Sequence, residues 1–157
     1  MKTIYFIITL SLLFGLLVIR CDSPTQEKTK STTPTKPIVV KKKVVIDLDN
    51  KGIGPIDSLV LGELDMKMAE EGKVLFEEYN CSHCHKTEEK HIGPPMANVM
   101  DRRSPEWVMN MILNPDEMTK KDPIAHQLLI DYNGAAMGVQ NINEKDTRII
   151  LEYLRTL

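Results

Sequence analysis

The chain has 157 residues, of which 42% are hydrophobic and only 5% are aromatic, and this size indicates one globular domain with additional segments. Its formal net charge of −2 is distributed unevenly. Residues 22–51 carry 7 basic and 4 acidic side chains, a net charge of +3. Residues 52–157 carry 11 basic and 18 acidic side chains, a net charge of −7. A domain this acidic is not expected to bind nucleic acid.

Residues 1–21 are predicted to be a targeting segment. Lys2 supplies a positive start, and residues 4–19 are almost entirely apolar, which suits a long signal sequence or a short membrane span. Cys21 follows directly, so the segment resembles a bacterial lipoprotein signal, with Arg20 where that class has a small residue. Lipidation, an uncleaved anchor helix and a released protein are the alternatives. The first two would hold the protein on the periplasmic side of a bacterial membrane.

Residues 22–51 are predicted to form a flexible tether. Ser, Thr, Pro and Lys dominate residues 23–43, and such a composition cannot bury enough apolar surface to become ordered. Asp47 begins a stretch similar to a calcium loop, but Lys51 stands at position 5 and Ser58 at position 12, where a bidentate glutamate is needed. Calcium binding is therefore rejected. The folded domain is predicted to span residues 52–157.

The first and last helices of the domain are predicted from apolar stripes at helical spacing. Residues 65–79 form the first, and Gly72 lies on its apolar face, where a glycine indicates that another element approaches closely. Asn143 is a suitable N-cap for the last helix, whose leucines and isoleucines follow the same period. We expect these two helices to contact each other.

Two further helices are predicted between them. Ser104-Pro105 and Asp122-Pro123 are start signals, with a capping side chain followed by proline at the first helical position. Asn114-Pro115 is expected to end the first of the two helices. No convincing strand pattern remains, so the domain is predicted to be all-α.

Cys81-Ser82-His83-Cys84-His85 is the motif with the clearest chemistry. C-x-x-C-H is typical of covalent haem attachment, because each thiol can bond one vinyl group and the histidine then faces the iron. A redox dithiol and half of a zinc site are the alternatives. A zinc site needs a second ligand pair, which His91 and His126 do not form, and a thioredoxin-like motif would lie beside a βαβ pattern. The motif therefore predicts one haem c.

Residues 65–157 resemble a class I mono-haem cytochrome c. Besides the attachment motif, residues 72–76 resemble the G-x-x-x-F of that family's N-terminal helix, and residues 150–154 resemble its C-terminal helix. The resemblance implies a cytochrome c fold, with about four to five helices around the haem. It also implies that the terminal helices cross where Gly72 faces Ile150 and Tyr153.

The same resemblance implies the iron ligands. His85 is the expected proximal ligand, and the carbonyl oxygen of Pro94 is expected to accept the free N–H of its ring, which fixes the ring orientation. Met137, in a loop of small residues before the last helix, is the expected sixth ligand, and a thioether there raises the reduction potential. Met118, His126 or an open site are the alternatives.

Trp107, Arg102 and Arg103 are candidate donors to the haem propionates. Buried carboxylates need charge-assisted partners, and the planar fork of arginine suits them. A solvated turn is the alternative for the two arginines, and a core position is the minimal role of Trp107.

The resemblance implies one-electron transfer in a respiratory chain and no enzymatic activity, because an iron with protein ligands on both sides has no vacant site for substrate. Residues 102–115 also resemble a stretch of bacterial membrane-anchored cytochromes c, some of which accompany nitrous oxide reductase or other terminal respiratory enzymes. The acidic domain predicts a redox partner with a basic docking patch, such as a terminal reductase, an oxidase or a quinol-oxidising complex. A haem-based sensor or gas-binding protein, a small peroxidase and a fixed relay subunit are the alternatives.

Overall fold

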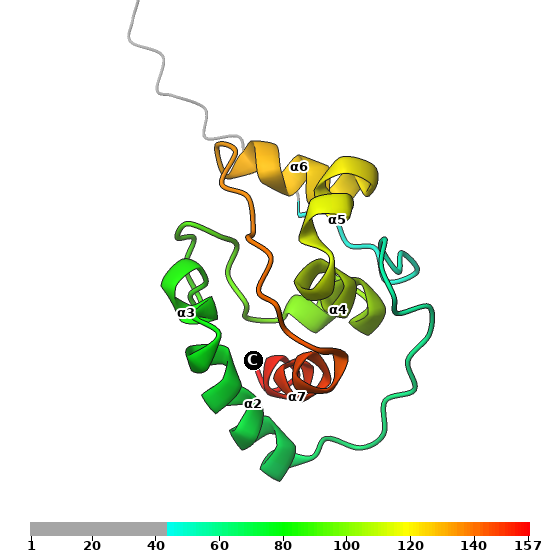
Figure 1. Cartoon of the computed structure of the whole chain (residues 1–157), viewed down its shortest axis with the longest axis vertical. Coiled ribbons are helices and arrows are strands. Elements are labelled where there is room, and N and C mark those ends of the chain that lie inside the picture. The colour runs from blue at the N-terminus through cyan, green and yellow to red at the C-terminus, as the bar shows by residue number, and fades with distance from the viewer. Residues whose placement is uncertain (1–43) are drawn as a thin grey trace, which may run out of the picture. The chain divides into compact units, whose positions relative to one another are not determined.

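The computed structural model describes residues 44–157, and helices joined by irregular segments make up this part of the chain. The helices are α2 (Met66–Glu78), α3 (Cys81–Cys84), α4 (Pro105–Leu113), α5 (Pro115–Lys121), α6 (Pro123–Asp131) and α7 (Glu144–Leu154), with a 3-10 turn, η1, at Val99–Asp101 (Figure 1). The all-α prediction is confirmed for the described residues. The targeting segment, Cys21 and the tether up to residue 43 lie outside them. No helix between residues 44 and 157 is long and apolar enough to cross a membrane.

Three of the helices begin where the sequence predicts. The side chains of Ser104, Asp122 and Asn143 each accept a hydrogen bond from a backbone N–H in the first turn of α4, α6 and α7. Pro105 and Pro123 occupy the first helical positions. These side chains satisfy N–H groups that have no partner inside the helix, so the three starts are determined locally.

Helices α2 and α7 pack against each other (Figure 1). Gly72 lies where they cross. A Cβ atom at Gly72 would lie 2.3 Å from the carbonyl oxygen of Ile149 and 3.0 Å from Cβ of Tyr153, so only glycine permits this approach. The backbone of Ile149 makes the close contact that the sequence assigned to Ile150, whose side chain is instead buried in the core. Phe76 packs edge-on against Tyr153, with ring centroids 5.5 Å apart.

The structure contains two short helices that the sequence did not predict, and the six helices among residues 44–157 exceed the expected four to five. One is α3, which holds the attachment motif. The other is α5, which begins at Pro115, the residue expected only to end α4. Proline lacks an N–H group, which costs nothing in a first turn, so the same residue can follow one helix and begin the next.

An irregular segment, residues 44–64, lies on the domain before α2 and is called the N-terminal strip below (Figure 1). Buried side chains of α4 hold its middle. The side chain of Asn110, 1% exposed, donates to the carbonyl oxygens of Lys51 and Ile56 and accepts from the N–H of Ile56. The carboxylate of Glu106 accepts from the N–H of Leu59 at 3.0 Å.

The strip also corrects the predicted domain boundary at residue 52. The Arg103 guanidinium donates to the carbonyl oxygen of Val45, and Asp47 forms an isolated β-bridge with Arg103. Residues 45–51 are therefore packed on the domain and are not part of a tether. The composition of this stretch could not reveal that, because its partners lie more than 50 residues further along the chain.

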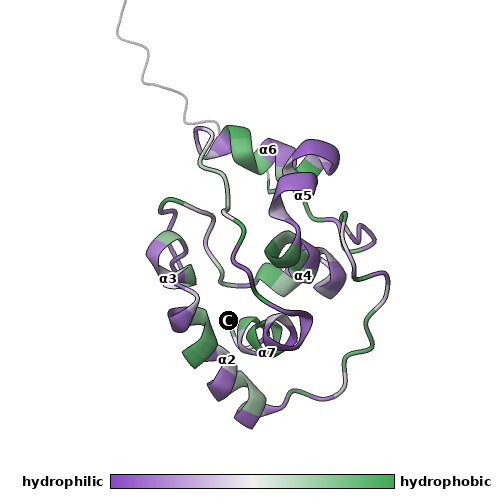
Figure 2. Cartoon of the chain, in the orientation of Figure 1, coloured by the Kyte–Doolittle hydropathy of each residue, from purple (hydrophilic) through white to green (hydrophobic). Residues whose placement is uncertain are grey.

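The core lies between α2, α4, α6 and α7, and the facing parts of α2 and α7 are hydrophobic (Figure 2). Its buried members are Phe76, Val99, Trp107, Val108, Met109, Met118, Ile124, Ala125, Ile150, Leu151 and Leu154. Several of these side chains also form the wall of a cavity, so the core and the functional site are continuous.

Candidate functional site

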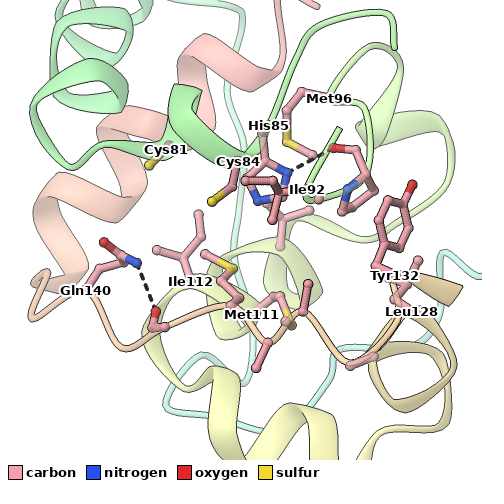
Figure 3. Close-up of a pocket in the computed structure, with 18 of the residues that line it drawn as sticks. Cys81, Cys84, His85, Ile92, Met96, Met111, Ile112, Leu128, Tyr132 and Gln140 are labelled. Carbon is pink, nitrogen blue, oxygen red and sulfur yellow. Dashed lines mark hydrogen bonds between the residues drawn. The ribbon is translucent and has the colours of Figure 1, made fainter. Parts of the chain in front are cut away.

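A cavity opens beside α3, with an empty volume of about 1140 Å³ that includes the space at its mouth. Side chains from α2, α3, α4, α6 and α7 line it, together with the loops before α4 and α7. They include Phe76, Cys81, Cys84, His85, Pro94, Met96, Trp107, Met111, Ile112, Leu128, Tyr132, Met137 and Gln140 (Figure 3). The mainly apolar walls of this cavity suit a macrocycle.

Helix α3 presents the attachment motif to this cavity. Asn80, in the left-handed conformation with φ of 59°, turns the chain between α2 and α3. The single helical turn of α3 then brings Cys81 and Cys84 to the same side, because residues three apart are neighbours on a helix. His85 follows in extended conformation, and all three side chains line the cavity (Figure 3).

The imidazole of His85 is held from two sides. Its Nδ1 lies 2.9 Å from the carbonyl oxygen of Pro94, the contact expected from the sequence, and Nδ1–H is the donor because a carbonyl oxygen only accepts. Burial lowers the pKa of His85 and outweighs the opposing effect of this hydrogen bond, so the neutral ring is favoured. Nδ1 is thereby occupied, and Nε2 is the nitrogen that can bind a metal.

Gly93 lets the chain pass against the face of this ring. A Cβ atom at Gly93 would lie 2.6 Å from Cε1 and 2.8 Å from Nδ1 of His85, and its backbone N–H donates to the carbonyl oxygen of Cys84. Gly93 was not among the site residues expected from the sequence. Its requirement for glycine comes from the packing of the ring and has no local signal.

Arg102 does not line the cavity. Its guanidinium donates to the carbonyl oxygens of Pro95 and Ala97, at 3.0 and 2.5 Å, and so braces the loop that carries Pro94. Arg103, also a candidate, is buried and lies over the ring of Trp107, with Cζ 5.1 Å from the ring centroid. Both guanidiniums have protein partners here, and a role toward the propionates stays a prediction.

Trp107 contributes a wall of the cavity, and its side chain is only 4% exposed. The indole N–H donates to Oδ1 of Asp122 at 3.1 Å. A hydrogen bond from Trp107 to a propionate would require this partner to be exchanged. Asp122 was recognised in the sequence only as a helix start, and nothing local indicates its contact with Trp107.

Met137 lines the cavity from the segment between α6 and α7, which lies across from His85 (Figure 3). The alternatives Met118 and His126 do not line it. The Met118 side chain is fully buried, and its sulfur accepts a hydrogen bond from the N–H of Ile53 at 2.9 Å. His126 is exposed, and its Nδ1 is hydrogen-bonded to the carbonyl oxygen of Thr119.

Met96 and Met111 also line the cavity, although neither was expected there from the sequence. Figure 3 places Met96 beside His85, whereas Met111 extends from α4 on the opposite side. Met111 lies four residues after Trp107, so both fall on one face of α4. This spacing is the signal that could have placed Met111 at the site.

The two alternative readings of the cysteine motif find no support here. Burial raises the pKa of the Cys81 thiol to about 11, the opposite of the low pKa that a redox dithiol needs. Among residues 44–157, no group of three or more His, Cys, Asp and Glu side chains could hold a metal ion, so a zinc site is absent from that part of the chain.

Known proteins with a related sequence or structure share this architecture. The model of the cytochrome c family matches residues 69–157, more than half of the chain. The cytochrome c of Rhodothermus marinus is 39% identical over 66% of this chain and 88% of its own, with a TM-score of 0.63. An engineered form is also 39% identical, over 66% and 89%, with a TM-score of 0.62. An engineered form bound to a carbene intermediate is 38% identical, over 66% and 88%, with a TM-score of 0.60. No curated protein sequence matches the chain.

The residues of the cavity suit covalently bound haem. Two cysteines face a space with mainly apolar walls, and an imidazole oriented through Nδ1 lies beside them. The wall side chains Phe76, Trp107 and Ile150 are also core residues, so the bound group becomes part of the core. The fold, the attachment motif and the family match agree: the chain belongs to the cytochrome c family, which binds haem c covalently.

Proposed function

We propose that this cytochrome carries single electrons in a respiratory chain, with His85 and Met137 as the two axial ligands of its iron. When bound, haem iron supplies a reversible one-electron couple between the ferrous and ferric states. The observation that carries the proposal is that His85, oriented through Nδ1 and favoured in its neutral form, shares one apolar cavity with the segment of Met137.

The protein's contribution is to orient the histidine ligand within a mainly apolar cavity. Pro94 orients the imidazole, and the braced loop behind it, fastened by Arg102, keeps that carbonyl in place. Apolar side chains from α4, α6 and α7 and from the loops between the helices form the remaining wall. A site filled by protein ligands favours electron transfer over substrate chemistry, because no coordination position is left for a substrate.

Replacing Met137 by Ala tests the axial assignment. The variant should lose the methionine-to-iron charge-transfer absorption band of the ferric protein and have a lower reduction potential. Met111→Leu is the matched control, because it removes a thioether from the same cavity and should leave the band in place. If Met137→Ala kept both the band and the potential while Met111→Leu lost them, the sixth ligand would be Met111.

The setting of this electron transfer is also part of the proposal. Residues 1–21 anchor the protein to a bacterial membrane through lipidated Cys21 or an uncleaved helix, and the domain works on the periplasmic side. The net charge of −7 on residues 52–157 favours redox partners with a basic docking patch. A quinol-oxidising complex as donor and a terminal reductase or oxidase, including nitrous oxide reductase, as acceptor fit this description.

A second candidate is a haem protein that binds a gas or another small ligand. From Ala136 to Ile142, within the described chain, the one hydrogen bond is that from the Gln140 side chain to the carbonyl oxygen of Gly138, so little holds the segment of Met137 in place. The engineered relative bound to a carbene shows that a relative's site admits a small ligand. Imidazole titration of the ferric protein separates the two functions: a carrier should show displacement only at high concentration, and a sensor at low concentration.

A further inference from the structure

The N-terminal strip reaches the wall of the haem cavity through one buried carboxylate. Asp122 is 3% exposed and accepts three hydrogen bonds, from Nδ2 of Asn50 at 2.6 Å, from Nε1 of Trp107 at 3.1 Å and from the N–H of Ala125 at 2.7 Å. These donors belong to the strip, to α4 and to α6. One side chain therefore joins three segments that are far apart in the sequence.

Asn50 is itself held firmly. Its carbonyl oxygen accepts from the hydroxyl of Ser104 at 2.6 Å, its side-chain oxygen accepts from the N–H of Gly52 at 2.8 Å, and its N–H donates to Asp47 at 3.0 Å. Its Nδ2 is thereby aimed at Asp122. The strip consequently has a defined contact with the haem site, in addition to its attachment along α4 by Asn110.

Trp107 lies between opposite charges. The guanidinium of Arg103 covers its ring, and the Asp122 carboxylate accepts its N–H. Oxidation of the site adds one positive charge, so a buried carboxylate that is hydrogen-bonded to a residue of the cavity wall favours the oxidised form. A hydrogen-bond donor to that carboxylate offsets part of its negative charge and has the opposite effect.

We propose that Asp122 is a positioning residue that fixes Trp107 against the haem and sets the reduction potential, and that Asn50 couples the N-terminal strip to this control. The proposal deepens the electron-carrier function and rests on it. Asp122 is also the N-cap of α6, a purely structural role. Asparagine caps helices equally well, so a change to Asn separates the two roles.

Reduction potentials of the haem-loaded full-length chain test the proposal. In Asp122→Asn, the ferrous-to-ferric ratio at a fixed applied potential should rise on the order of tenfold. For a one-electron couple this corresponds to a reduction potential that is higher by about 59 mV. In Asn50→Ala, the ratio should fall by about threefold, because the carboxylate loses its donor. Near-ultraviolet circular dichroism of Trp107, the only tryptophan, should also change in Asn50→Ala.

Two variants serve as matched controls. Glu106→Gln makes the same chemical change, from a carboxylate to an amide, at another buried side chain. The Glu106 carboxylate accepts a hydrogen bond from Leu59 of the strip and has none with Trp107. Asn114→Ala removes another asparagine side chain that bonds the strip, at the carbonyl oxygen of Ile53. Both should leave the ratio within about twofold of the wild type, because neither side chain bonds Trp107 or Asp122.

The proposal is overturned if Asp122→Asn shifts the potential no more than Glu106→Gln, or if Asn50→Ala behaves like Asn114→Ala. If Asp122→Asn yields no haem-loaded protein, the comparison of Asn50→Ala with Asn114→Ala decides alone. The axial assignment is judged separately, from the methionine-to-iron band of the wild type. Absence of that band would contradict the assignment of Met137 while leaving these comparisons valid.

Discussion

Gly72 on α2 touches the backbone of Ile149 on α7, so closely that a Cβ atom would lie 2.3 Å from the Ile149 carbonyl oxygen. The Ile149 carbonyl belongs to the helix backbone, so it cannot move aside as the end of a flexible side chain can. The two helices therefore depend on glycine at their crossing, and α2 leads within three residues to the attachment motif at Cys81. The crossing is the scaffold that positions the haem site.

Replacing Gly72 by Ala should lower the free energy of unfolding by about 1–3 kcal/mol, because the helices must move apart to accept the methyl group. Urea unfolding of the haem-loaded protein measures this loss. Gly62→Ala is the control: no atom lies within 4 Å of its added Cβ, and its effect should stay within about 0.5 kcal/mol. Equal stability of the two variants would contradict the close crossing.

Gly93→Ala should disturb the proximal histidine. The added Cβ would lie 2.6 Å from Cε1 of His85, so the ring must rotate and its hydrogen bond to Pro94 must weaken. We expect a partly high-spin absorption spectrum and a lower midpoint of thermal unfolding. Gly138→Ala, whose Cβ would lie 3.8 Å from its nearest neighbour in the same cavity, should keep the wild-type spectrum.

Glu152 should make stability depend on pH. Its carboxylate is 0% exposed, and burial alone would raise its pKa. Hydrogen bonds from the N–H of Asp65 and from Arg155 and Arg148 together outweigh burial and hold the pKa of Glu152 below its ordinary value. The carboxylate thus joins the end of the N-terminal strip to α7.

A lowered pKa in the folded state means that the unfolded chain takes up the proton first as pH falls. The contribution of Glu152 is therefore complete above the ordinary glutamate pKa, roughly 4.3, and decreases as pH falls through the lower pKa of the folded state. Glu152→Gln should remove this dependence and cost about 2 kcal/mol at neutral pH. Urea unfolding at a series of pH values checks this. Glu117→Gln, at an exposed ion pair, should retain nearly the wild-type slope.

The charge of the domain should govern its reaction rates with small redox reagents. Reduced protein should react more slowly with a tripositive cobalt phenanthroline complex as salt is added, and faster with ferricyanide, which is an anion. Stopped-flow absorption measures both rates. Salt profiles with the same slope for the two reagents would show that the net charge of −7 on residues 52–157 does not act where the reagents exchange electrons with the protein.

The sequence by itself determined the features that depend on local chemistry. The attachment motif predicts the cofactor, and the caps at Ser104, Asp122 and Asn143 begin their helices. Gly72 on an apolar stripe predicts that another helix crosses there. Each of these signals is complete within a few residues. Turn chemistry and helical spacing require nothing from the rest of the chain.

Tertiary structure alone decided where the long side chains go. Asp122 accepts the Trp107 N–H and Arg102 braces the loop of Pro94, although both donors had been candidates for the propionates. Packing also placed Met118 in the core and Met111 at the cavity. A buried polar group takes whichever partner the packing brings within about 3 Å, and that choice is made between segments tens of residues apart.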